Sequence, residues 1–224
     1  MIPLKDKNPS GTFPFVNYVL IASNILVFVY ELSLGSGLNS FFVKYGLVPS
    51  RYFILAAEHS HIVGRFVPFF TSMFIHGGWL HIIGNMWFLF IFGDNVEDRF
   101  GHGRYLVFYI LCGLAAAALQ TFLSAGSDVP TIGASGAISG VLGAYLIMFP
   151  KARIVTLLPI FFFFSVIDLS ALIFIGIWFL LQLFSGLGSY GMDTSGGVAW
   201  WAHVGGFVAG IAIVPLFRKK RFTF

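Results

Sequence analysis

A serine and a histidine, Ser135 and His203, stand in separate apolar segments, and each has a pair of glycines close by. A serine hydroxyl is a weak nucleophile, and an adjacent imidazole activates it by accepting its proton. The two residue types therefore indicate nucleophilic attack on a carbonyl, if the fold brings them together. Glycines four residues apart let two helix backbones approach closely, so packing one glycine face on the other would bring the imidazole to the hydroxyl. These glycines are Gly136, Gly140, Gly206 and Gly210.

Attack on a carbonyl also requires hydrogen-bond donors that already point at the oxyanion it creates. Asn85 offers an amide donor and His81 an imidazole donor, and their spacing of four residues places them on one helix face. Ser135 is expected to open a helix, where unpaired backbone N–H groups and the helix dipole favour negative charge. Acidic residues near His203 fall only in loops, so we predict a Ser–His dyad without a buried acid. Packing or water would then orient the imidazole.

The composition places these residues in a membrane. Of the 224 residues, 58% are hydrophobic and only 10% are charged, whereas a soluble domain has about 25% charged residues. The net charge is +4, but the basic residues are scattered in small groups and form no face for nucleic acid. Cys112 is the only cysteine, which excludes a disulfide framework and a cysteine-based zinc site.

Six apolar segments approach the ~20 residues that a transmembrane helix needs. The first has no small-residue cleavage site behind it, so we expect a span and not a removed signal peptide. The fourth is short: at ~1.5 Å per residue it covers about 24 Å of a ~30 Å hydrocarbon core, which predicts a depression at one end. We expect one all-α polytopic membrane domain over 1–224, with spans at 14–34, 79–93, 104–124, 134–149, 169–186 and 199–217.

Basic residues between the segments indicate the orientation of the chain. With six crossings, ten of the 13 Lys and Arg residues fall on one side, and such an excess marks the cytoplasmic side. Both termini are therefore predicted in the cytoplasm. The short loops and compact size are typical of a prokaryotic inner membrane protein. The ten residues are Lys5, Lys7, Arg99, Arg104, Lys151, Arg153, Arg218, Lys219, Lys220 and Arg221.

In this orientation, the polar residues of three spans lie at one depth near the outer surface. Polar groups within spans are costly and mark functional sites by default.

The outer connection 35–78 is expected to form short interfacial helices, and the Gly- and Ser-rich connection 186–198 is expected to be a mobile lid. The inner segment 159–170 reads as a re-entrant or interfacial piece or an early start of the fifth span, with Asp168 at a helix start.

Three stretches of the chain resemble the rhomboid intramembrane serine proteases. They are HGGWLHIIGNMWFLFIFGDNVEDRFG at 76–101, GASG at 133–136 and AHVGGFVAG at 202–210. Three motifs in this order are specific, whereas a lone GxSG would be weak. The resemblance implies cleavage of other membrane proteins near the ends of their transmembrane helices, without a cofactor or a metal. It implies Ser135 as nucleophile, His203 as general base, His81, Asn85 and Gly133 at the oxyanion, and Glu97 and Arg99 as cytoplasmic structural links.

Two positions depart from patterns found in many family members. A Trp-Arg pair in the first outer loop is replaced here by Val67 and Pro68. A tyrosine that stacks on the catalytic histidine in some members is replaced by Ser139, so Trp200, Trp201 or water must orient the imidazole instead.

Other readings of the same residues remain open. Serine in a membrane helix usually serves packing, and His81 and Asn85 could simply join helices. His59 and His61 form an HxH pair without a carboxylate-rich partner, which favours a solvated loop over a metal site, and His76 is expected to support its loop. A non-catalytic relative that binds client helices is the main alternative. A transporter would need polar residues through the full depth and paired broken helices.

Overall fold

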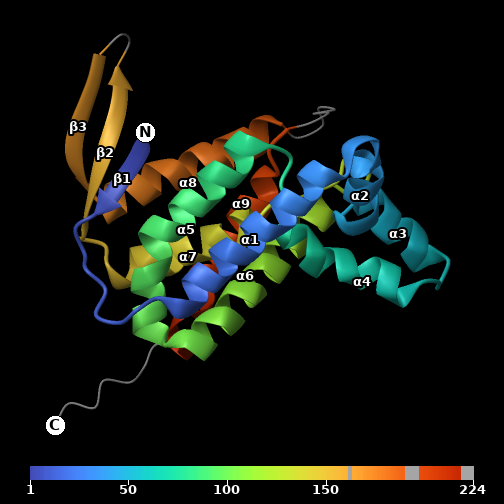
Figure 1. The fold of residues 1–224 in the computed structure, drawn as a ribbon, viewed down its shortest axis with the longest axis horizontal. Coiled ribbons are helices and arrows are strands. Elements are labelled where there is room, and N and C mark those ends of the chain that lie inside the picture. The colour runs from blue at the N-terminus through green and yellow to red at the C-terminus, as the bar shows by residue number, and fades with distance from the viewer. Residues whose placement is uncertain (161–162, 190–196, 218–224) are drawn as a thin grey trace.

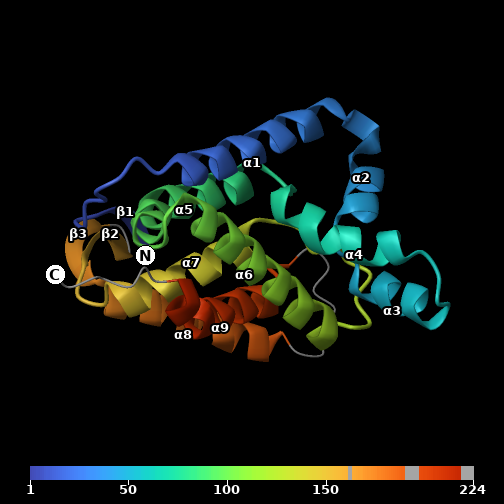
Figure 2. The same cartoon turned by 90° about the horizontal axis from the view of Figure 1, so that it is seen from below.

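The computed structural model describes residues 1–160, 163–189 and 197–217. Six helices lie side by side in a bundle and run obliquely to the longest axis of the molecule (Figures 1 and 2). The expected helical membrane bundle is confirmed. Its helices are α1 (Phe15–Ser33), α5 (Trp79–Phe100), α6 (His102–Leu123), α7 (Ser135–Met148), α8 (Ala171–Gly188) and α9 (Trp200–Phe217).

Four of these helices, α1, α6, α8 and α9, are each long and apolar enough to cross a membrane. Helix α5 meets that standard only together with the segment Ile62–Phe74 before it, from which it is bent by 78°. Helix α7 has 14 residues, or about 21 Å at ~1.5 Å per residue, which is shorter than the bilayer core. The structure thus supports a multi-pass membrane protein, and the count of six crossings stays a prediction.

Helix α7 forms the centre of the bundle, and every residue from Gly136 to Tyr145 is buried. Its glycines lie against those of α9: a Cβ on Gly206 would collide with the carbonyl of Gly136, and one on Gly210 with that of Gly140. Helix α6 packs on the same glycines, because a Cβ on Gly136 would lie 2.6 Å from the Ala116 side chain. The backbones of α7 and α9 therefore touch at these glycines, with no side chain between them.

Short helices fill the connection between α1 and α5, as expected, and lie at one end of the bundle (Figure 2). Leu47 in this connection forms a two-hydrogen-bond bridge to Thr131, with N···O distances of 3.0 and 2.8 Å. The connection thereby holds the loop that leads into α7. Its elements are η1 (Gly35–Gly37), α2 (Leu38–Tyr45), α3 (Pro49–Ala57), α4 (Ile62–Thr71) and η2 (Ser72–Phe74).

A three-stranded antiparallel sheet lies at the opposite end (Figure 1). Its strands are β1 (Ile2–Asp6), β2 (Arg153–Ile160) and β3 (Phe163–Ser170), in the order β1-β2-β3. Asp6 pairs with Ile154, and Arg153 pairs with Ser170. The N-terminal strand is thus joined to the chain that follows α7.

Residues 159–160 and 163–170 lie in strands β2 and β3, so the expectation that 159–170 is an early start of the fifth span is wrong for them. Asp168 does not start a helix: it lies in β3, and its carboxylate accepts a hydrogen bond from Lys7 Nζ at 2.6 Å. Ser170 caps α8 instead, since its side chain accepts from Ile173 N. The physical reason is that a short, largely apolar run shows no period that separates a strand from a helix.

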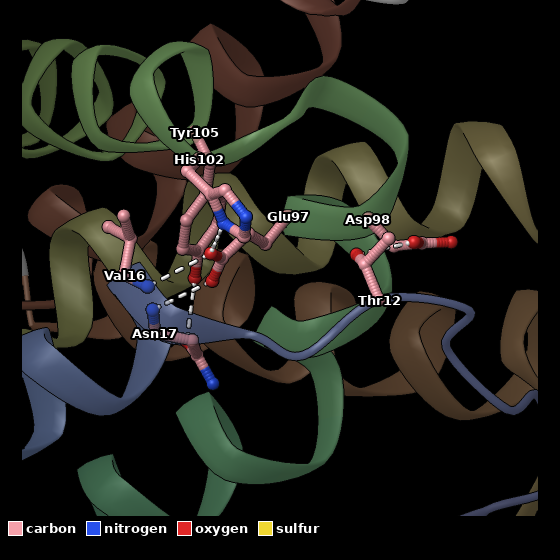
Figure 3. Close-up of polar contacts among 7 residues, drawn as sticks. All are labelled: Thr12, Val16, Asn17, Glu97, Asp98, His102 and Tyr105. Atoms are coloured by element: carbon pink, nitrogen blue, oxygen red, sulfur yellow. Dashed lines mark hydrogen bonds and ion pairs between the residues drawn. The ribbon is translucent and has the colours of Figure 1, made fainter.

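A buried carboxylate joins three helices at the sheet end (Figure 3). Glu97 of α5, with no exposed surface, accepts hydrogen bonds from the first N–H groups of α1, at 2.9 Å from Val16 N and 2.7 Å from Asn17 N. Its other partner is His102 Nδ1 of α6. Tyr105 of α6 donates to Asn17 Oδ1 at 2.8 Å.

Arg99 contacts the end of α7 near the same network, with its guanidinium carbon 5.1 Å from the centre of the Phe149 ring. Helix α9 also ends there, because the rings of Phe217 and Phe100 lie 5.8 Å apart. Phe217 and strand β1 are thus at the same end of the bundle, which favours an even number of crossings.

Two expectations concern residues outside those that the structure describes. They are most of the expected lid, at 190–196, and the basic residues 218–221.

Candidate active site

Ser135 and His203 meet at the end of the bundle opposite the sheet. Ser135 is the first residue of α7, and His203 lies in the first turn of α9. Because the α7 and α9 backbones touch at their glycines, the two side chains come within hydrogen-bond distance. The hydroxyl of Ser135 lies 2.8 Å from His203 Nε2, and the His203 side chain is nearly buried.

Gln182 of α8 lies on the other side of the imidazole, with its Oε1 atom 2.7 Å from His203 Nδ1. Its amide nitrogen donates to the backbone carbonyl of Trp178 at 3.4 Å. A carbonyl only accepts hydrogen bonds, so the nitrogen must face Trp178 and the oxygen must face His203. His203 Nδ1 then carries the proton, and Nε2 offers its lone pair to Ser135.

Gln182 is the site residue that sequence reasoning missed, because that reasoning searched for acids beside His203. The available signal was one amide inside an apolar segment, and polar residues within spans are functional candidates.

Two tryptophan rings flank the imidazole. The Trp178 ring lies 6.0 Å away at 34°, and the Trp200 ring lies 6.2 Å away at a right angle. Of the expected alternatives, Trp200 thus packs on His203, whereas the Trp201 ring lies near Gly186. Ser139 does not reach the imidazole, since its hydroxyl donates to the carbonyl of Ser135 at 2.6 Å.

His81 presents an N–H group toward the loop before Ser135. Its Nδ1 accepts from Gly77 N at 3.3 Å, so in the neutral ring the proton is on Nε2. A Cβ built on Gly133 would lie 2.6 Å from that Nε2 and 3.7 Å from Ser135 Oγ. Gly133 also has a φ of 124°, which disfavours a side chain. Position 133 is therefore glycine because His81 and the backbone leave no room.

Asn85 is buried one turn after His81, and its amide nitrogen has no hydrogen-bond partner among the described residues. An unpaired buried donor costs about 1–3 kcal/mol, so this amide is available to an acceptor that arrives later. The N–H of Gly133 is not available, because it donates to the carbonyl of Ser72 at 2.8 Å. This contact argues against the expected oxyanion role of Gly133. The first N–H groups of α7 have no carbonyl partner within the helix.

The remaining histidines lie farther from the Ser135–His203 pair. His76 is buried, its backbone N–H faces the Glu31 carboxylate at 3.2 Å, and its ring packs edge-on to His81. This supports the expected role of His76 in its loop. His59 and His61 both have positive φ angles in the turn between α3 and α4. Within residues 1–160, 163–189 and 197–217, no three His, Cys, Asp or Glu side chains cluster as metal ligands.

The position of the Trp-Arg pair that many rhomboid proteases carry corresponds to Val67 and Pro68, which lie in α4. Arg65, one turn earlier, places its guanidinium carbon 5.2 Å from the ring of Tyr52 in α3. A cation–π contact of this kind stabilises by about 0.5–1 kcal/mol at an exposed site. Arg65 thus links the two short helices.

Comparison with known proteins points to one family. The family model for the Rhomboid domain matches residues 63–220. The chain is 30% identical over 199 residues to Rhomboid protease GluP of Bacillus subtilis, covering 88% of this chain and 34% of GluP. It is 30% identical over 157 residues to the mitochondrial presenilin-associated rhomboid-like protein of Bos taurus, covering 64% of this chain and 36% of that protein.

A shorter match links the chain to RHOMBOID-like protein 5 of Arabidopsis thaliana, with 34% identity over 76 residues, or 34% of this chain and 25% of that protein. The chain thus spans about a third or less of the length of these relatives.

Proposed function

The chain belongs to the rhomboid family, and from that premise we propose that it is a serine endopeptidase that cleaves transmembrane helices of other membrane proteins near their outer ends. The observation that carries the proposal is the 2.8 Å contact between Ser135 Oγ and His203 Nε2. Two side chains 68 residues apart in sequence meet there in the arrangement that nucleophilic catalysis needs.

His203 acts first as general base and then as general acid. Nε2 takes the hydroxyl proton while Ser135 Oγ forms a bond to the scissile carbonyl carbon, whose oxygen becomes an oxyanion. The same proton passes to the leaving amine as the peptide bond breaks. In the second half of the reaction, His203 takes a proton from water, which attacks the acyl-enzyme. The proton then passes to Ser135 Oγ, which restores the hydroxyl and releases the second product.

The oxyanion is bound by three kinds of donor. The proposed donors are the unpaired amide of Asn85, the Nε2–H of His81, which faces Gly133, and the N–H groups of the first turn of α7, which lack a carbonyl partner within the helix. Donors of this kind stabilise the transition state because they are in place before charge develops, and removal of one costs about 10²–10³ in kcat.

The substrate is a single-span membrane protein that approaches from the lipid. An intact helix hides its carbonyls in hydrogen bonds, so the substrate must unwind near its outer end, and small helix-breaking residues favour this. Helix α8 is the proposed lateral gate, and the short α7 lets water reach the site from the outer side. No cofactor takes part.

We assign the protein to the bacterial inner membrane, with both termini in the cytoplasm. The excess of basic residues on the terminal side supports this. The active site then faces the outer leaflet, because Ser135 lies at the end of the bundle away from strand β1 and Phe217.

Replacement of Ser135 tests the function directly. In proteoliposomes with a model single-span substrate, Ser135→Ala should abolish cleavage, while Ser139→Ala, one turn further along α7, should retain it. A fluorophosphonate probe should label the wild-type protein, and His203→Ala should lose that label. Cleavage that survives Ser135→Ala would refute the proposal and leave the non-catalytic, client-binding alternative.

A further inference from the structure

We propose that Gln182 is the positioning residue of the Ser135–His203 pair, and that it makes the base competent only while α8 packs against α9. The inference rests on the proposed function, since it concerns how the same imidazole is oriented. It adds a third member to the predicted dyad, contributed by a helix that carries neither the nucleophile nor the base.

The hydrogen bonds of Gln182 leave one arrangement for its amide. The oxygen lies 2.7 Å from His203 Nδ1, and the nitrogen faces the Trp178 carbonyl at 3.4 Å. A flipped amide would turn its N–H group toward Nδ1 and its oxygen toward another carbonyl oxygen. The observed orientation therefore holds the Nδ1–H tautomer, in which Nε2 has the lone pair that accepts the Ser135 proton.

The tautomer matters because the other one places a proton on Nε2, where it opposes the Ser135 hydroxyl proton. In serine proteases with an acid in this position, substituting the acid so that the wrong tautomer forms lowers kcat by about 10⁴. An amide oxygen selects the tautomer without a charge, which suits a nearly buried position where an isolated carboxylate would be costly.

Neighbouring side chains do not replace Gln182. The rings of Trp178 and Trp200 can restrict rotation of the imidazole, but an aromatic ring does not select one nitrogen for the proton. Ser139 is engaged with its own helix. Among the titratable groups in the described part of the chain, His81 of α5 is the one near enough that a positive charge on it would oppose protonation of His203.

Gln182 couples the base to the position of α8. Helix α8 contacts α9 through the stacked rings of Phe179 and Phe207, 4.3 Å apart, and through Gly186, where a Cβ would lie 3.3 Å from the Trp200 side chain. If α8 moves aside to admit a substrate helix, Gln182 moves with it and His203 loses its Nδ1 partner. The base is then restored when α8 returns.

Two substitutions test the proposal in the purified full chain in proteoliposomes. Gln182→Met has a similar size but no acceptor, and it should lower kcat by about 10- to 100-fold, as loss of a hydrogen bond to a group that becomes charged does, with KM unchanged. Gln182→Glu should retain activity and move the acidic limb of the kcat profile to higher pH by about one unit or more, because a carboxylate stabilises the protonated imidazole.

Gln120→Met is the matched control. Gln120 of α6 also contacts α9, accepting from Ala202 N at 3.1 Å, but it does not touch the imidazole. It should change thermal stability without moving the pH profile. If Gln182→Met loses activity while Gln182→Glu leaves the acidic limb unmoved, Gln182 is merely structural and the proposal is overturned.

Unchanged kcat in Gln182→Met would also overturn it. Ser135→Ala in the same assay separates this failure from failure of the proposed function: if cleavage does not depend on Ser135, the function itself is wrong.

Discussion

Both ends of the bundle bury polar side chains, but they leave them in different states. At the sheet end, Glu97 accepts from two backbone N–H groups and contacts His102, and Tyr105 donates to Asn17 (Figure 3). Each of these groups has a partner. At the other end, buried donors such as the amide nitrogen of Asn85 have none among the described residues.

The difference separates stability from chemistry. A satisfied buried network fixes helix positions, whereas an unsatisfied buried donor costs stability unless a ligand pairs with it. We therefore expect the polar residues at the sheet end to stabilise the bundle and those near Ser135 to serve the proposed substrate. Substitutions at the two ends should separate these effects.

The largest effect is expected at the glycine contact between α7 and α9, because the packing of the bundle and the approach of His203 to Ser135 both depend on it. Gly206→Ala would push a methyl group into the carbonyl of Gly136 and force α7 from α9. We expect a loss of stability above the ~1–3 kcal/mol of ordinary overpacking, together with loss of cleavage. Thermal unfolding in detergent and the cleavage assay measure both. Gly176→Ala on α8 is the control, because a Cβ there meets nothing within 4 Å; a stable, active Gly206→Ala protein would contradict the packing argument.

Substitution of the unpaired buried donor near Ser135 should reduce catalysis without reducing stability. Asn85→Leu keeps the size of the side chain and removes the donor, so kcat should fall by about 10²–10³ with no loss of stability. Kinetics and thermal unfolding of the same sample measure this. Asn24→Leu in α1 removes another buried asparagine and should leave kcat unchanged. A stability loss in Asn85→Leu without a kinetic effect would reverse the assignment.

Substitution in the hydrogen-bonded network at the sheet end should lower stability and leave catalysis unchanged. Glu97→Ala leaves the N–H groups of Val16 and Asn17 without their acceptor, and it should lower the free energy of unfolding by about 3 kcal/mol. The folded fraction should keep its turnover per fluorophosphonate-reactive serine. If turnover per reactive serine also fell in Glu97→Ala, the network at this end would serve catalysis as well as stability.

The smallest effect concerns Asp6 in β1. Burial raises the pKa of its carboxyl from 3.8 to about 6, against a hydrogen bond from Tyr145 that lowers it. The folded state therefore binds the proton more tightly than the unfolded state, and stability falls as pH rises from about 4 to 6. Since Asp6 is partly exposed, we expect a loss of about 1 kcal/mol.

Asp6→Asn should remove that slope while retaining an oxygen for the Tyr145 hydroxyl. The test is the melting temperature at pH 4.5 and pH 7.5 for both proteins. Equal slopes would mean that another group causes the pH dependence.

The sequence predicted the helices and the approach of Ser135 to His203 because both depend on local signals. Apolar length identifies spans, and small residues four apart identify the face on which helices meet. His81 and Asn85 followed from helical spacing and depth. These are properties of one segment at a time, together with one rule of packing.

The rest required the three-dimensional arrangement. The sequences of β2 and β3 are largely apolar and show no regular alternation of apolar and polar residues, so the sheet that they form with β1 could not be predicted from a period. Gln182 acts through an atom of another helix, and no spacing within α8 reveals that contact. The donor of Gly133 is occupied by Ser72, a backbone contact between distant segments that no motif records.

The pairing of Asp6 with Ile154 also has a consequence for biosynthesis. Residues 2–6 leave the ribosome before α1, but the strand that receives them is made only after α7. Until β2 is made, this short segment lacks its strand partner, and the partners already made are side chains of α5, such as Trp87 Nε1, which donates to the carbonyl of Pro3 at 2.6 Å. The pairing of β1 with β2 is therefore one of the later contacts to form, because it needs chain made after α7.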